Sequence, residues 1–260
     1  MPTTANDGVD LYYETTGGDR TDETVAFVGD VGYGAWQWGW QHAAVAGPYR
    51  SLVADLRGSG RSDAPPGPYP MATLADDLTT VLSDAGVRSA HVVGAGLGGM
   101  VALAAARNTA RVKSLVLVGT AARGDDLTLD PLWGAPDDPA TLEDSLVAGL
   151  SGTFVDERPA ALEQMVEWRA SEDADRAAWD AQAAAVHDFD VSDELYEITE
   201  PALVIHGRDD AVWPVERGER LAEGLPRGEF LGIDDAGHLV HIEVSKRVND
   251  ELLGFLPDLE

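Results

Sequence analysis

Six runs of apolar, largely β-branched residues recur along the chain of 260 residues, each bordered by glycine or aspartate. Continuous apolar runs of this length are typical of strands that are buried on both faces of a parallel sheet. Helical patterns separate the runs, and their alternation predicts an α/β fold with a mostly parallel, doubly wound sheet. In the clearest helical pattern, residues 73–86, we expect Thr73 to be the N-cap and Gly86 to be the stop. The six runs lie at residues 24–32, 49–58, 89–96, 112–120, 201–210 and 228–238.

The alternation stops between residues 121 and 195, where the sequence is alanine-rich, acidic and helical in period. A helical insertion late in an α/β sheet is placed over the carboxyl ends of the strands, where open sheets carry their sites. We therefore predict one α/β core, residues 1–120 and 196–260, with a helical cap at 121–195.

The charge balance of the chain is strongly acidic, with 46 acidic and 18 basic residues and a formal net charge of -28. The acidic residues are spread over segments that also carry core residues, which indicates a folded chain with an acidic surface. Such a surface repels itself unless salt screens it, so we expect a salt-adapted protein. Nucleic acid and anionic membranes are poor partners for it.

Other features of the composition narrow the possibilities further. No run of about 18 apolar residues and no basic-then-apolar leader is visible, so we expect a cytoplasmic protein. The chain has no cysteine, which excludes disulfides, thiolate nucleophiles and cysteine-ligated metals. Because the histidines show no metal-ligand spacing, we expect neither a metal nor a cofactor.

The segment "HVVGAGLGGM" fits two motifs. Gly94, Gly96 and Gly99 match G-x-G-x-x-G, a dinucleotide-binding turn, whereas Gly94, Gly96 and Gly98 frame a nucleophile elbow G-x-S-x-G without its serine. A dinucleotide site needs an acid about 20 residues further on, at the end of the next strand. Glycine and threonine stand there instead (119–120), and the elbow is favoured.

Three further motifs carry a resemblance to a known family. They are "DLRGSGRSD" (55–63), "HGRDD" (206–210) and "GHLVHIE" (237–243). With the elbow, they make the chain similar to capped proteins of the α/β-hydrolase fold, such as esterases, lactonases and haloperoxidases. The resemblance implies a catalytic acid at Asp210 and a catalytic base at His238, in the family's order of nucleophile, acid and histidine.

The sequence departs from that family at two places. Gly96 stands at the nucleophile position and has no side chain, and Gly29-Asp30 replaces the usual His-Gly after the first parallel strand. The resemblance implies that the oxyanion donors are the backbone N–H groups of Val31 and Leu97. A carboxylate on Asp30 beside them opposes a developing negative charge. We therefore expect no acyl-enzyme chemistry.

Three functional hypotheses remain open. The first is a small-molecule-pocket protein, a sensor or carrier, with absent or very weak serine hydrolase activity. The second is an enzyme in which the His238–Asp210 dyad is a general base toward a small apolar ester, lactone or carbonyl substrate. The third is a hydrolase with a relocated nucleophile, at Asp30 or Ser62.

Structural roles compete with each of these hypotheses. The His238–Asp210 pair alone can hold two loops together, Ser62 can cap a turn, and Asp30 can pair with loop N–H groups. We expect a small-molecule ligand, in an apolar pocket to which tryptophans contribute, although each tryptophan can equally be structural. The pocket candidates are Trp36, Trp133 and Trp213.

Overall fold

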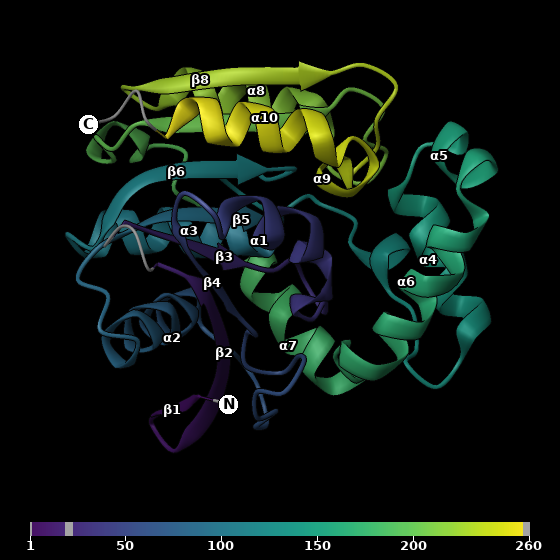
Figure 1. Cartoon of the computed structure of the whole chain (residues 1–260), viewed down its shortest axis with the longest axis horizontal. Helices are drawn as coiled ribbons and strands as arrows, with labels where there is room; N and C mark the ends of the chain where they lie inside the picture. Colours follow the sequence, from purple (N-terminus) through teal and green to yellow (C-terminus); the bar gives the residue numbers. More distant parts are fainter. Residues whose placement is uncertain (1, 19–22, 257–260) are drawn as a thin grey trace.

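The computed structural model describes residues 2–18 and 23–256, which form an eight-stranded sheet with helices on both faces (Figure 1). The strand order is β1-β2-β4-β3-β5-β6-β7-β8. β2 pairs antiparallel with both β1 and β4. From β4 onward in this order, which includes β3, each strand is parallel to its neighbours. This confirms the predicted fold class. The strands are β1 (Thr3–Asn6), β2 (Val9–Gly17), β3 (Thr24–Val28), β4 (Arg50–Ala54), β5 (Ala90–Ala95), β6 (Val112–Val118), β7 (Ala202–Gly207) and β8 (Gly228–Ile233).

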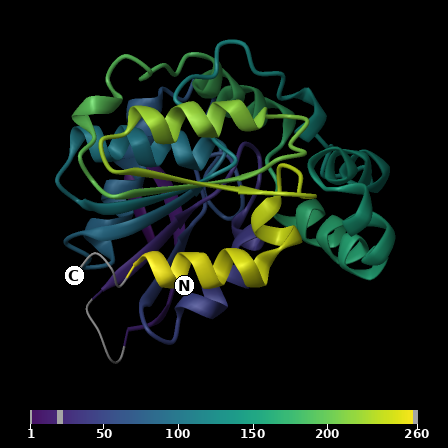
Figure 2. The same ribbon diagram turned by 90° about the horizontal axis from the view of Figure 1, so that it is seen from above.

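Helices cover both faces of the sheet, and Figure 2 shows α8 and α10 on opposite faces. Successive residues of a strand point to opposite faces, so Val92 packs in one apolar cluster with α2, α3 and α8, and Val93 in a second with α1 and α10. The helices are α1 (Gly39–Val45), α2 (Met71–Asp84), α3 (Leu97–Asn108), α4 (Pro139–Gly149), α5 (Gly152–Glu157), α6 (Pro159–Glu172), α7 (Arg176–His187), α8 (Val215–Gly224), α9 (Val240–Glu243) and α10 (Ser245–Phe255).

The helical pattern at residues 73–86 forms α2, whose apolar side chains are buried. The prediction that Thr73 is its N-cap is wrong: α2 begins at Met71, and Pro70 is the N-cap without a side-chain hydrogen bond. Gly86 follows the helix with a φ of 70°, a conformation that glycine adopts without strain.

The segment between β6 and β7 contains helices α4 to α7, and its described residues add no strand to the sheet. In Figure 1, helices α4, α5 and α6 lie at the end of the sheet to which the arrows of β6 and β8 point. α7 returns toward the core and contacts α3. The predicted division into core and cap is consistent with this course but stays a prediction.

Candidate active site

The elbow between β5 and α3 turns at Gly96, which has a φ of 46° and a ψ of -114°. A residue with a side chain is strained at this positive φ, and glycine is not. A Cβ added to Gly96 would overlap the carboxylate of Asp30, and one added to Gly98 would overlap the carbonyl of Val28. The glycines of this segment therefore serve the close packing of α3 against the strands.

Asp30 lies two residues beyond β3, and its carboxylate occupies the space above Gly96. Its Oδ1 accepts hydrogen bonds from the backbone N–H of Val31 at 2.7 Å and of Leu97 at 2.8 Å. These are the two groups that the sequence predicts as oxyanion donors. The Asp30 carboxylate therefore occupies the expected oxyanion position, whereas the sequence predicted that it would lie beside this position.

His238 lies between two carboxylates. Its Nδ1 is 2.8 Å from Oδ2 of Asp210, and its Nε2 is 2.8 Å from Oδ2 of Asp30. Asp210 Oδ1 in turn accepts the backbone N–H groups of Val212 and Trp213 at 2.9 and 2.8 Å. The turn after β7 therefore fixes Asp210, and Asp210 fixes the orientation of the His238 ring.

The site is buried, and the charge of His238 lies between the charges of two carboxylates. The side chains of Asp30 and His238 are 1% and 2% exposed. Burial alone would lower the pKa of His238, but the charges of Asp210 and Asp30 and their hydrogen bonds raise it to about 10. Burial opposes ionisation of Asp210 as well, yet the charge of His238 holds its pKa far below the usual value. At neutral pH His238 is therefore a cation, and it cannot accept a proton while Asp30 remains beside it.

A second histidine contacts Asp210. His206 is fully buried, and its Nε2 lies 3.1 Å from Asp210 Oδ2 and 2.8 Å from the carbonyl oxygen of Trp213. Its position in the strand gave no signal for this contact, because β7 is buried along its whole length. Asp210 Oδ2 therefore contacts both His206 and His238.

The helical segment between β6 and β7 holds the loop that carries Asp30. Gln182 of α7 accepts the N–H of Gly32 at 2.6 Å and donates to the carbonyl of Arg57 at 2.9 Å. The carbonyl of Gly32 accepts the N–H of Ala174 at 2.8 Å. No motif marks Gln182, although a polar residue among the alanines of a buried helix face is a usable signal.

The three predicted pocket tryptophans have different surroundings. Trp213 is buried, with its ring 5.8 Å from the His238 ring. Trp36 donates its Nε1–H to Asp173 and packs near Trp168, and Trp133 packs edge-on against Trp179. Only Trp213 among the three is in ring contact with His238, so they do not line one pocket around it.

Ser62, the other predicted candidate for a relocated nucleophile, does not belong to this site. Its hydroxyl accepts the N–H of Tyr12 at 2.9 Å and donates to the carbonyl of Asp55 at 2.8 Å. It stabilises the "RGSGRSD" turn, and the interpretation as a turn residue replaces the catalytic one.

No group of three or more histidines and carboxylates within residues 2–18 and 23–256 is arranged to hold a metal ion. In the same part of the chain, no helix has the length and apolar character needed to cross a bilayer.

An elbow after β5, an acid after β7, a histidine after β8 and N–H groups after β3 and at the elbow form the arrangement of an α/β-hydrolase site, with the Asp30 carboxylate in contact with His238 and both N–H groups. The family model of the alpha/beta hydrolase fold matches residues 32–244, and the chain belongs to this family.

Several proteins that match most of this chain are hydrolases by name. A protein assigned as the carbamate hydrolase RutD of Rhizobium rhizogenes is 30% identical, over 95% of this chain and 97% of its own length. A 2-hydroxy-6-oxononadienedioate/2-hydroxy-6-oxononatrienedioate hydrolase of Paraburkholderia phymatum is 33% identical, over 95% and 90%. The crystal structure of the enol-lactonase of Burkholderia xenovorans LB400 matches with a TM-score of 0.89 at 25% identity, over 98% of this chain and all of its own.

Proposed function

We propose that this protein is a hydrolase in which the Asp30 carboxylate is the nucleophile and attacks a saturated carbon that bears an anionic leaving group. One observation carries the proposal: the Asp30 carboxylate contacts both predicted oxyanion N–H groups and Nε2 of His238. In a serine hydrolase these groups are kept for the reacting atoms.

The first step is alkylation of Asp30. Oδ2 attacks the substrate carbon, the new C–O bond forms as the bond to the leaving group breaks, and the leaving group departs with the electron pair. Oδ1 becomes the carbonyl oxygen of an alkyl ester and keeps its bonds to Val31 and Leu97. Alkyl halides are the simplest substrates with this chemistry.

Alkylation changes the protonation of His238. The ester is uncharged, so one of the two carboxylates that raise the pKa of His238 is removed. The pKa falls, the proton is lost to solvent together with the departed anion, and His238 becomes a base that Asp210 still orients.

The second step is hydrolysis of the ester. A water molecule attacks Cγ of Asp30 while His238 takes its proton, and the two N–H groups stabilise the negative charge that develops on Oδ1. Collapse expels the alkoxide, which receives the proton from His238. Asp30 is left as a carboxylic acid and passes its proton to His238, which restores the ion pair.

The same contacts argue against acyl transfer to a serine. Gly96 supplies no hydroxyl, and while Asp30 Oδ1 occupies the oxyanion N–H groups, an ester or lactone carbonyl cannot use them. The His238–Asp210 dyad is also no base for direct attack by water, because His238 is protonated while Asp30 faces it. We therefore still predict absent or very weak serine hydrolase activity.

A second candidate is a protein that retains the fold without catalysis. In it, Asp30 is a plug, that is, a carboxylate that permanently fills the space above Gly96 and pairs with the surrounding N–H groups. The observation that favours it is burial, since Asp30 and His238 are almost wholly covered. Catalysis at Asp30 requires the loop held by Gln182 to open for the substrate.

A single turnover in ¹⁸O-labelled water tests the proposal. Halide release from a panel of bromoalkanes first identifies a substrate, and excess enzyme is then mixed with it in labelled water. We expect the label in the peptide that contains Asp30 and an unlabelled first alcohol, because the alcohol oxygen comes from Oδ2. Label in the alcohol and none in the peptide would refute nucleophilic attack by Asp30.

Variants separate the candidates further. Asp30→Asn is expected to abolish halide release, and His238→Gln is expected to accumulate an alkylated Asp30 that mass spectrometry detects. Ser62→Ala, at the other candidate nucleophile, is the matched control and is expected to retain activity. Absence of turnover for every bromoalkane and every activated ester favours the plug, and strong turnover of activated esters by the unaltered protein contradicts both candidates.

A further inference from the structure

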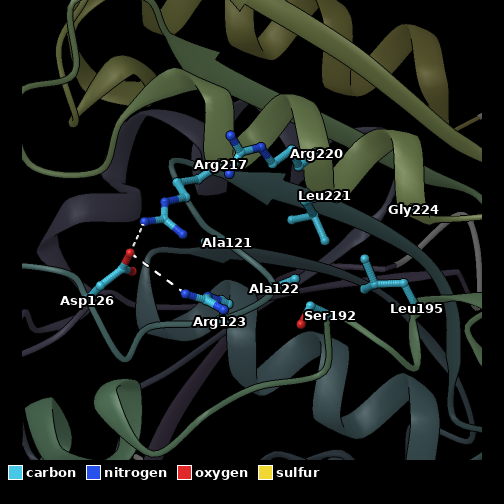
Figure 3. A pocket seen from close by; sticks show the side chains of 10 residues that line it. All are labelled: Ala121, Ala122, Arg123, Asp126, Ser192, Leu195, Arg217, Arg220, Leu221 and Gly224. Carbon is cyan, nitrogen blue, oxygen red and sulfur yellow. Dashed lines mark hydrogen bonds and ion pairs between the residues drawn. The ribbon is translucent and has the colours of Figure 1, made fainter.

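A cavity of about 420 Å³ opens at the junction between the cap and α8 (Figure 3). Residues from the segments 121–126, 192–195 and 217–224 line it, and none of the four groups Asp30, Gly96, Asp210 and His238 is among them. Its volume lies within the range of small-molecule sites. Because it is open to solvent, a ligand can enter it without the opening that the buried site needs.

The lining of this cavity is basic on an otherwise acidic protein. Arg123, Arg217 and Arg220 line it, with Asp126 as the one acidic residue of the lining. The whole chain has 18 basic and 46 acidic residues, so three arginines around one cavity form a local reversal of charge. Figure 3 shows Asp126 between Arg217 and Arg123, whose ion pairs it shares.

Arg220 has no partner in the part of the chain that the structure describes: no hydrogen bond, ion pair or ring contact involves its side chain. Glu216 and Glu223 stand about one turn before and after it on α8, where helical carboxylates commonly pair with arginine. Arg220 nevertheless pairs with neither and lines the cavity. Its charge is therefore available to a ligand.

The same cavity has an apolar wall. Leu195 and Leu221 are buried residues that reach it, and Ala121 and Ala122 complete this side. Guanidinium groups bind carboxylates through paired, charge-assisted hydrogen bonds, and the apolar wall suits a short hydrocarbon chain. We propose that this cavity is a binding site for a small aliphatic carboxylate, with its head group at Arg217 and Arg220.

Titration calorimetry with hexanoate tests the site on the whole protein at constant salt. We expect hexanoate to bind, and hexanol, which has the same chain without the charge, to bind at least about tenfold more weakly. Inorganic phosphate supplies charge without a chain. Tighter binding of phosphate than of hexanoate would overturn the carboxylate assignment.

Variants locate the binding. Arg220→Gln removes a charge that no contact within the described residues uses, so folding should be unaffected, and we expect hexanoate affinity to fall about tenfold. Arg217→Gln should weaken binding as well, although it also removes the ion pair with Asp126. The matched control is Arg176→Gln, which removes an exposed, ion-paired arginine outside the cavity. Equal losses in Arg220→Gln and Arg176→Gln, or no hexanoate binding to the unaltered protein, would refute the site.

Discussion

The ion pair between Asp30 and His238 predicts a distinctive loss of stability with rising pH. The folded-state pKa of His238 is raised from 6.5 to about 10. A histidine with a raised folded-state pKa binds its proton more tightly in the folded state, so its stabilising contribution is full below pH 6.5 and is gone above pH 10.

The magnitude follows from the shift. Each pKa unit corresponds to about 1.4 kcal/mol, so the contribution is about 5 kcal/mol at low pH and falls by about 1.4 kcal/mol per pH unit between the two values. Between pH 7 and pH 9 the free energy of unfolding should therefore fall by about 3 kcal/mol. Lysines and tyrosines ordinarily titrate above this window.

Urea unfolding at pH 7, 8 and 9, at constant salt concentration, measures this fall, and Asp30→Asn provides the comparison. The amide carries no charge, so the pKa of His238 in the variant is lower and the fall between pH 7 and pH 9 should be clearly smaller. The Asp210 contact remains in the variant. A flat profile for the unaltered protein, or the same fall in both proteins, would refute the assignment of the charge to His238.

Three further outcomes are expected. Gly96→Ser alone should destabilise the protein, because the new side chain overlaps Asp30 and the positive φ costs about 1–3 kcal/mol. The double variant Asp30→Gly with Gly96→Ser should instead gain measurable hydrolysis of p-nitrophenyl acetate. A double variant that folds but does not hydrolyse this ester contradicts an intact acyl-transfer site. Gln182→Leu leaves the N–H of Gly32 and the carbonyl of Arg57 unpaired and should lower the free energy of unfolding by about 1–3 kcal/mol per group, whereas exposed Gln164→Leu should change it little. Raising KCl from about 0.1 M to about 1 M shortens the screening length from about 10 Å to about 3 Å and should raise the melting temperature of a chain with a net charge of -28; an unchanged or lower melting temperature argues against salt adaptation.

The parallel strands could be predicted because a strand that is buried on both faces requires an uninterrupted run of apolar residues. All six runs contain a strand, from β3 to β8. The antiparallel strands β1 and β2 gave no such run, because they lie at the edge of the sheet and much of their surface is exposed. The start of α2 was misplaced because Pro70 begins the helix without a side-chain cap, which leaves no polar signal at that position.

The positions of Asp210, His238 and the elbow could be predicted from motifs in a fixed order along the chain. The orientation of Asp30 could not, because it depends on the space above Gly96, a residue 66 positions away that β3–β5 pairing brings close. The same holds for Gln182, which reaches Gly32 across 150 residues. Contacts of this kind are set by packing: a polar residue among alanines can mark Gln182, but neither spacing nor composition identifies its partners.

The two departures from the family pattern, Gly96 and Asp30, are best understood as one coupled change. A serine at position 96 would overlap the Asp30 carboxylate, so the carboxylate needs the glycine. Conversely, glycine without the carboxylate would leave the N–H groups of Val31 and Leu97 and Nε2 of His238 buried without these partners, at a cost of about 1–3 kcal/mol for each neutral group.

Either replacement alone, glycine at position 96 or aspartate at position 30, is therefore unfavourable, whereas the two together fit the same space. Random loss of a catalytic serine predicts no compensating group, whereas here one carboxylate contacts His238 and the N–H groups of both Val31 and Leu97. A plug needs only to fill the space and pair the donors. The arrangement also presents Oδ2 to the histidine that would later activate water, with Oδ1 already in the oxyanion site, and this division between the two oxygens favours a nucleophile over a plug.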